Sequence, residues 1–127
     1  MAERILISSG SPYENTVGFS RAVRVDDRVF VAGTAPIWPD GEVDPDPGVQ
    51  AARCFEIIGL ALEDAGASFS DVVRTRMYLT DAAHQDAVGI EHGKIFSEIR
   101  PAATMVVAGG LLDPRWHVEI EVEAVIG

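Results

Sequence analysis

Three carboxylates at every second position near the carboxyl end of the chain are the residues best placed for chemistry. Glu119, Glu121 and Glu123 alternate with apolar residues, so in a strand they share one face, with side chains about 6.8 Å apart. Like charges at this spacing repel, so that face must meet water, cations or a site that raises a carboxyl pKa. A glutamate with a raised pKa could act as a general acid or base near neutral pH.

Cationic partners for these glutamates come from the predicted strand over residues 71–79. Arg74 and Arg76 fall on one face of that strand, together with Val72 and Tyr78, whereas Val73 and three further residues fall on the other face. If the two strands lie side by side, we expect Glu121 and Glu123 to form ion pairs with these arginines.

Other catalytic chemistry has little support in the sequence. The chain has no HxxxH or CxxC spacing, so we expect His84, His92 and His117 to bind no metal, and His92 to be a hydrogen-bonded helix residue. Neither a nucleophile elbow nor a glycine-rich phosphate loop is present. Cys54 lies beside an apolar helical stripe, which predicts a buried thiol rather than a nucleophile.

Composition limits the class of protein. The 127 residues are 47% hydrophobic, which fits one domain over residues 1–127. The net charge of −10 and the lack of a Lys/Arg cluster argue against binding to nucleic acid or to an anionic membrane. A single cysteine allows no internal disulfide and suits a cytoplasmic location, and we expect neither a signal peptide nor a membrane-spanning helix.

The periodicity of apolar residues predicts eight elements joined by loops. Asp46 followed by Pro47 indicates the start of a helix that Gly66 ends, and Thr80 or Asp81 starts a second helix that stops before Pro101. Strands are expected over residues 4–8, 19–25, 28–32, 71–79, 104–108 and 117–125. Gly33 is expected to end the third strand, and residues 9–18 and 34–48 are expected to be loops.

The order of these elements predicts an α+β fold, with a single mixed sheet and both helices on one face. The first helix has an apolar stripe formed by Ala51, Phe55, Ile58, Leu62 and Ala65. Gly89 and Gly93 lie four residues apart on the second helix, which predicts a close approach to another backbone. The other sheet face would be left bare, so we expect the chain to oligomerise.

Four segments together resemble the Rid family, also called the YjgF or endoribonuclease L-PSP family. They are GFSRAVRVDDRVFVAGTAP, VRTRMYLTD, IRPAATMV and HVEIEVEAV. The resemblance implies a chorismate-mutase-like fold and a homotrimer with a central barrel. It also implies ligand clefts between subunits, where reactive enamines and imines are hydrolysed to keto acids and ammonia without a cofactor.

Carried over residue by residue, the resemblance places Glu119 as the glutamate that positions the hydrolytic water. The residues that it places around the substrate are Phe19, Ala32, Gly33, Ala103, Thr104 and Met105. Much of the polar lining differs from that of active members. Alanine stands at 103 instead of the arginine that clamps the substrate carboxylate, phenylalanine at 19 instead of tyrosine, alanine at 32 instead of serine, and glycine at 89 instead of asparagine.

These differences predict an apolar cleft in which desolvation raises the pKa of Glu119. Arg100, Arg115 or an arginine of a neighbouring subunit are candidates to replace the missing clamp. Three functions follow: hydrolysis of a small imine or enamine, binding of a small metabolite or partner without catalysis, and, least favoured because of the net charge, ribonuclease activity.

Overall fold

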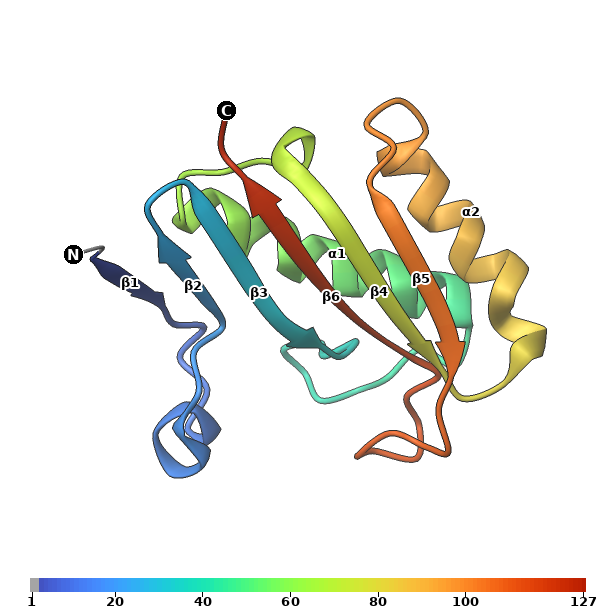
Figure 1. Cartoon of the computed structure of the whole chain (residues 1–127). Coiled ribbons are helices and arrows are strands. Elements are labelled where there is room, and N and C mark those ends of the chain that lie inside the picture. The colour runs from blue at the N-terminus through green and yellow to red at the C-terminus, as the bar shows by residue number, and fades with distance from the viewer. Residues whose placement is uncertain (1–2) are drawn as a thin grey trace.

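A computed structural model describes residues 3–127 as one six-stranded sheet covered on one face by two helices (Figure 1). The sheet order is β1-β2-β3-β6-β4-β5, and β4 and β5 run parallel whereas the other neighbours are antiparallel. The strands are β1 (Arg4–Ile7), β2 (Ala22–Val25), β3 (Arg28–Thr34), β4 (Val72–Leu79), β5 (Ala102–Val107) and β6 (Val118–Val125).

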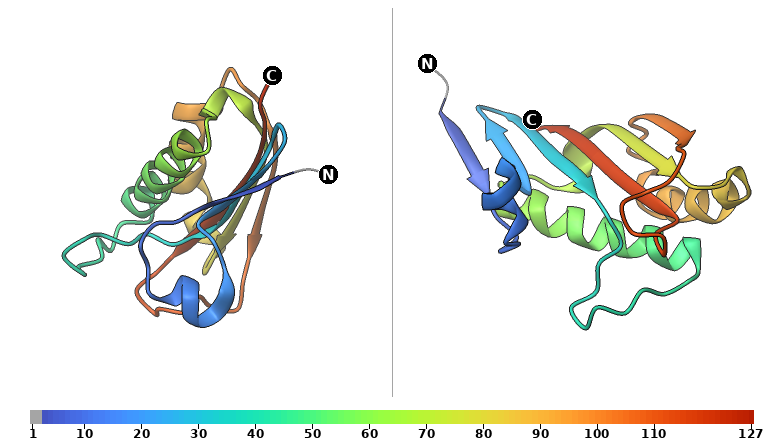
Figure 2. Two further views of the ribbon diagram at one scale, coloured as in Figure 1. Left: turned by 90° about the vertical axis from the view of Figure 1, so that its left-hand side faces the viewer. Right: turned by 90° about the horizontal axis from the view of Figure 1, so that it is seen from below.

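Both long helices, α1 (Pro47–Asp64) and α2 (Gln85–Phe96), lie on the same side of the sheet. The edge-on view in Figure 2 shows the two layers and leaves the other sheet face without a covering helix. The predicted α+β architecture, with a single mixed sheet and two helices on one face, is confirmed. No helix within residues 3–127 has the length and apolar character needed to cross a membrane.

Helix α1 begins and ends at the residues that the sequence indicated. The Asp46 carboxylate accepts hydrogen bonds from the backbone N–H groups of Gly48 and Val49, which the first turn otherwise leaves unpaired. At the other end, Gly66 has a φ of +84°, a left-handed conformation that strains most other residues. Arg24 Nη1 donates to the Ala65 carbonyl at 2.8 Å and so satisfies one of the last carbonyls of the helix.

The core forms where α1 packs on the centre of the sheet. All five residues of the predicted stripe, Ala51, Phe55, Ile58, Leu62 and Ala65, are buried. They meet apolar side chains of β3 and β6, among them Val29 and Ile120, which are fully buried. Cys54 is also fully buried, and burial raises the pKa of its thiol. The predicted burial of this thiol is confirmed.

A short 3₁₀ turn, Ala82–His84, precedes helix α2. The backbone N–H of Ala83 in this turn donates a hydrogen bond to the Asp81 side chain. His92 Nε2 and the fully buried Thr75 Oγ1 are 2.9 Å apart and share a hydrogen bond, which confirms the prediction for His92. The helix ends at Phe96, earlier than expected, and Arg100 takes a φ of 58° before Pro101.

The predicted close approach at Gly89 and Gly93 is wrong within this chain. A Cβ atom added at either position would have no heavy atom within 4 Å. Both glycines therefore face open space, because Val88 and Phe96 rather than the glycines turn toward the core.

Two β-bulges change the faces that simple alternation predicts. The pairing of β3 with β6 shifts between Val31 and Thr34, so Gly33 lies inside the strand and does not end it. The pairing of β4 with β6 shifts between Val72 and Arg74. The extra residue there turns Val72 into the core and leaves Val73 46% exposed, the reverse of the expected arrangement.

The segment before β2 is more structured than a loop. Residues Glu14–Gly18 form a π-helical turn, and β2 begins only at Ala22, so Phe19 lies in the connecting segment rather than in the predicted strand. The Glu14 carboxylate accepts from Ser9 N at 2.9 Å and from Ser9 Oγ at 2.7 Å. These bonds lower the pKa of Glu14 to about 2.

A buried glutamine joins three segments that the sequence treats as separate. Gln50 Nε2 donates to the carbonyls of Asp44 and Arg115, and its Oε1 accepts from His117 N at 2.7 Å. The side chain thus ties the proline-rich loop and the turn before β6 to the first turn of α1. Because each polar atom is paired, its burial leaves no unsatisfied group.

Candidate functional site

The open sheet face carries a ladder of alternating charge between β4 and β6. Arg74 pairs in register with Glu123, and Arg76 pairs with Glu121. Arg74 Nε lies 3.7 Å from Glu123, and Arg76 Nη1 lies 3.6 Å from Glu121 and 3.5 Å from Glu123. The ion pairs predicted for Glu121 and Glu123 are therefore confirmed.

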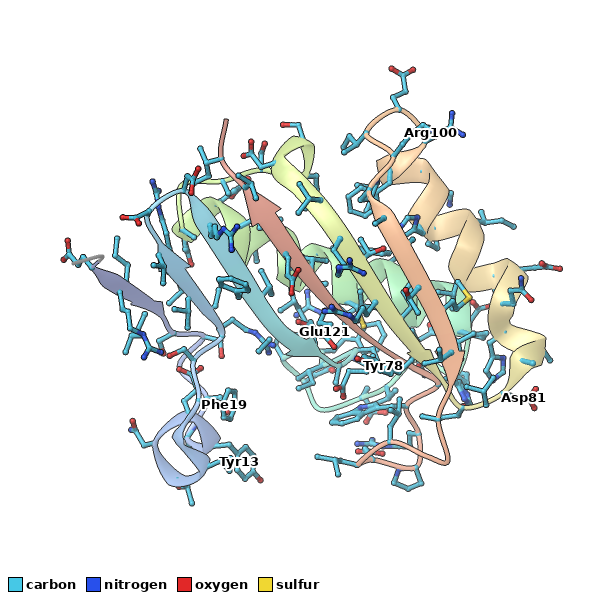
Figure 3. The ribbon with its side chains drawn as sticks, viewed as in Figure 1. Tyr13, Phe19, Tyr78, Asp81, Arg100 and Glu121 are labelled. Atoms are coloured by element: carbon cyan, nitrogen blue, oxygen red, sulfur yellow. The ribbon has the colours of Figure 1, made fainter. Side chains whose placement is uncertain are left out.

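Tyr78 extends this ladder in a way that the sequence analysis missed. Its hydroxyl donates a hydrogen bond to Glu121 Oε1, which raises the pKa of Tyr78. Figure 3 shows Tyr78 and Glu121 on the face turned away from the helices. Glu121 and Glu123 are thus both engaged with side chains of β4, whereas Glu119 is not part of these ion pairs.

Glu119 lies opposite Tyr78 in the register, but its carboxylate turns toward the bulge of β3. A Cβ atom added at Gly33 would lie 2.6 Å from Glu119 Oε2, closer than a carbon and an oxygen can approach. Glycine at position 33 therefore makes room for this carboxylate. Burial raises the pKa of Glu119, as the sequence analysis expected, and the charge of Arg21 opposes that rise.

Arg21 is a residue of this site that the sequence analysis did not identify. Its Nη2 atom donates at 2.8 Å to the carbonyls of both Ala32 and Gly33, the two residues of the bulge. Its Nε is buried without a partner among the described residues, and burial lowers the pKa of its guanidinium. Only its place in GFSRAVRV marks it in the sequence, because the bulge that it holds has no side-chain signature.

The remaining predicted site residues fall into two groups that one chain does not bring together. Phe19 and Ala32 line a cavity of about 850 Å³ beside the first three strands, which Glu121 also borders. Met105 lines a second cavity of about 520 Å³ between β5 and α2, together with Gly89 and Ile90. Three inter-strand spacings separate β3 from β5 in the sheet order, roughly 14 Å.

The β5 group is largely open to solvent. Ala103 and Thr104 are exposed, and Met105 is half-buried against the core. Ala103 pairs with Thr75 and Met105 with Met77, so these two side chains lie on the helix side of the sheet, whereas Thr104 pairs with Arg76 on the open face.

Within the chain, neither of the two arginines proposed as a replacement clamp is among the charges that shift the pKa of Glu119. Arg100 lies between α2 and β5, and Figure 3 shows it at the opposite end of the sheet from Tyr78. Arg115 donates to Asp113 at 2.8 Å and to the Gly41 carbonyl at 3.2 Å. The pair with Arg115 lowers the pKa of Asp113 to about 2.

The histidines do not assemble with acidic side chains or the cysteine. The rings of His84 and His117 lie 4.7 Å apart between centroids, while His92 is engaged with Thr75. Across residues 3–127, no three His, Cys, Asp or Glu side chains are grouped in a way that could hold a metal ion.

Similarity to known proteins extends over every part of the candidate site. The family model described as Endoribonuclease L-PSP matches residues 10–126, which include Glu119, the β3 bulge and β5. The chain belongs to the endoribonuclease L-PSP family. The suspected membership of the Rid or YjgF family is thereby confirmed.

Relatives and solved structures of the endoribonuclease L-PSP family match over nearly the full chain. Uncharacterized protein SCO2049 of Streptomyces coelicolor is 40% identical over 124 residues, which cover 95% of this chain and 91% of that protein. A RutC family protein of Pyrococcus abyssi is 36% identical over 98% of this chain and 97% of its own length. Rv2704 of Mycobacterium tuberculosis, described as a member of the YjgF/YER057c/UK114 family, superposes with a TM-score of 0.89 at 41% identity, covering 98% of this chain and all of that one (100%).

Proposed function

We propose that this chain is a Rid-type hydrolase that converts a small neutral or apolar imine or enamine into a carbonyl compound and ammonia. The observation that carries the proposal is the half-buried Glu119, whose carboxyl pKa is raised by burial and whose carboxylate packs against a glycine. A carboxylate of raised pKa accepts protons more readily near neutral pH, which suits a general base. Hydrolysis of a C=N bond requires only water and proton transfer, so the proposal includes no metal or cofactor.

In the proposed reaction, Glu119 accepts a proton from water as the water oxygen bonds to the carbon of the protonated imine, a state that an enamine reaches by taking up a solvent proton on its β-carbon. The neutral tetrahedral product carries a hydroxyl and an amino group on that carbon. Glu119 then returns this proton to the nitrogen, and the C–N bond breaks to release ammonia while the hydroxyl gives its proton back to the Glu119 carboxylate and becomes the carbonyl. We assign a second contact to the water, from a backbone carbonyl of residues 103–107.

The proposed site is a cleft between subunits of a homotrimer, as the family resemblance implies. The separation of the β3 and β5 groups within one chain supports this assembly, because a neighbouring copy could bring the two groups together. The uncovered sheet face also has apolar side chains, with Leu6 62%, Phe30 42% and Val106 44% exposed. An apolar sheet face without a covering layer favours association. A cytoplasmic location remains part of the proposal.

The neutral substrate class follows from alanine at position 103. A buried pair between an arginine and a carboxylate contributes about 2–5 kcal/mol by comparison with other buried charge pairs, and an alanine cannot supply it. Within the chain Arg115 is engaged with Asp113, and Nη2 of Arg21 is engaged with the bulge carbonyls. We therefore expect imines without a carboxylate to be hydrolysed faster than imines of amino acids.

The test is ammonia release from imines generated in situ, with neutral and carboxylate-bearing substrates of matched size. Glu119→Gln should lower turnover by about 10²- to 10⁴-fold, the usual contribution of a general base. Glu123→Gln is the matched control, because that glutamate belongs to the ion-pair ladder, and it should retain activity. The molecular mass of each variant in solution is measured to show whether its assembly is unchanged. Turnover unchanged by Glu119→Gln contradicts the assigned role.

A second candidate function is binding of a small apolar or carbonyl metabolite, or of a partner, without catalysis. Alanine at 103 and phenylalanine at 19 favour it, since both remove polar groups that act on substrate in active members. Binding of such a ligand measured by calorimetry, together with no release of ammonia from any imine, would support this alternative. Ribonuclease activity, which the family's name suggests, is disfavoured by the net charge of −10.

A further inference from the structure

Arg21 connects the bulge of β3 to the carboxylate of Glu119. A single nitrogen of its guanidinium accounts for hydrogen bonds to the Ala32 and Gly33 carbonyls, both at 2.8 Å. These are the residues at which β3 and β6 lose their regular pairing, so the ladder does not fix their position. Thr34 Oγ1 adds a bond to the Ala32 carbonyl at 2.8 Å, and the Arg21 carbonyl accepts from Ala32 N at 3.0 Å.

The position of the bulge decides where the Glu119 carboxylate can lie. Oε2 would be only 2.6 Å from a Cβ atom at position 33, so a small movement of Gly33 changes the space available to this oxygen. The charge of Arg21 acts on the same carboxylate, although the two side chains form no direct ion pair. The hydrogen bonds of Arg21 to the bulge and its positive charge therefore both act on the Glu119 carboxylate.

We propose that Arg21 is a positioning residue for Glu119, which holds the Ala32–Gly33 bulge against the Glu119 carboxylate and supplies its compensating positive charge. Its effect on turnover rests on the proposed hydrolase function, whereas its effect on the carboxylate does not. Arg21 does not touch the reacting atoms in this role. It acts through Gly33 and through the electrostatic field at Glu119.

The other groups around Glu119 do not provide this charge. On its own strand Glu121 is negative, and on β4 the residue opposite is Tyr78, whose hydroxyl is engaged with Glu121. From α1, the thiol of Cys54 is buried and its pKa is raised, so it is neutral. Desolvation and Glu121 both raise the pKa of Glu119, and Arg21 is the opposing cation.

The test is an NMR titration of Glu119 in full-length protein labelled with ¹³C at glutamate side-chain carboxyls, with the signal assigned by its loss in Glu119→Gln. Arg21→Gln removes the charge, so the pKa of Glu119 should rise by about 1. Arg24→Gln is the matched control, since Arg24 also donates to two backbone carbonyls from β2, those of Asp26 and Ala65. It should leave the Glu119 titration unchanged.

Arg21→Lys separates the two parts of the role, because it retains the charge and replaces the planar guanidinium. The titration of Glu119 should stay near that of the wild type, while the backbone amides of the bulge exchange hydrogen at least about tenfold faster. Unchanged exchange in this variant would overturn the positioning role even where Arg21→Gln does not fold. An unchanged pKa in folded Arg21→Gln, or an equal rise in Arg24→Gln, would overturn the electrostatic role.

Where turnover is measurable, Arg21→Gln should also move the acid limb of the kcat/KM profile to higher pH. If the wild type releases no ammonia from any imine, the proposed hydrolase function fails. The titration and the exchange rates still decide the role of Arg21 in that case, so the two failures are distinguishable.

Discussion

Replacing Gly33 by alanine tests the packing of the Glu119 carboxylate directly. The new Cβ atom would lie 2.6 Å from Oε2, with the carboxyl carbon at 3.5 Å, so the carboxylate must retreat by several tenths of an ångström. Oε2 is the end of a flexible side chain, which places the cost at the low end of overpacking, about 1 kcal/mol. Gly33 has no positive φ, so alanine in a strand also gains about 0.5–1 kcal/mol relative to glycine.

A double-mutant cycle separates these opposing terms. Gly33→Ala alone should change the free energy of unfolding by less than about 1 kcal/mol, since the terms nearly cancel. In a Glu119→Ala background no carboxylate is present, so the same change should become stabilising. The coupling free energy between the two positions is then about 1 kcal/mol, the overpacking cost itself, which is within the range for residues in contact.

Urea unfolding, followed by tryptophan fluorescence at one fixed protomer concentration, measures each corner of the cycle. Glu119→Gln should show little coupling with Gly33→Ala, because an amide fills the same volume as the carboxylate. Gly109→Ala is a control, since a Cβ atom there would meet nothing within 4 Å. A coupling below about 0.3 kcal/mol between Gly33→Ala and Glu119→Ala would mean that the carboxylate does not lie against the bulge.

Three further predictions concern stability around α2. Gly89→Ala should raise the free energy of unfolding by about 0.5–1 kcal/mol in urea titrations, because the position has open space and glycine weakens a helix; a loss of stability would show that a second molecule packs there. Thr75→Val should lower it by about 1–3 kcal/mol, because the half-buried ring of His92 loses its hydrogen-bond partner, whereas Thr75→Ser should lower it less. Burial lowers the pKa of His92 from 6.5, so the unfolded chain binds more protons than the folded chain just below that pH, and stability is lost as pH falls below 6.5. Unfolding at about pH 7.5 and about pH 5.5 should show this loss in the wild type and not in His92→Gln.

Side-chain periodicity predicted the parts of the fold in which one face of an element is buried. Asp46 and Gly66 mark α1 because each satisfies backbone groups that any helix end exposes. The pairing of Arg76 with Glu121 was predictable because the order of elements leaves few arrangements of the strands. These signals depend on residue type and spacing alone.

The bulges were not predictable, and the errors at the site follow from them. From the sequence, Gly33 predicts the end of a strand because glycine has low strand propensity. In the structure, glycine is required at this position to make room for the carboxylate of Glu119, which is 86 residues away in the sequence. Val72 and Val73 are chemically identical, so only the backbone pairing with β6 decides which of them is buried. The role of Arg21 depends on the same irregular backbone, which no local pattern specifies.

The isolation of Cys54 has a practical consequence for work on this protein. Thiol-directed reagents attack the thiolate at an accessible sulfur, and the chain's one cysteine is fully buried with a raised pKa. The folded native protein should therefore not react with maleimide dyes or thiol-directed nitroxide spin labels. A single cysteine introduced at an exposed position such as Leu112 would carry the probe alone, without first replacing a residue of the core.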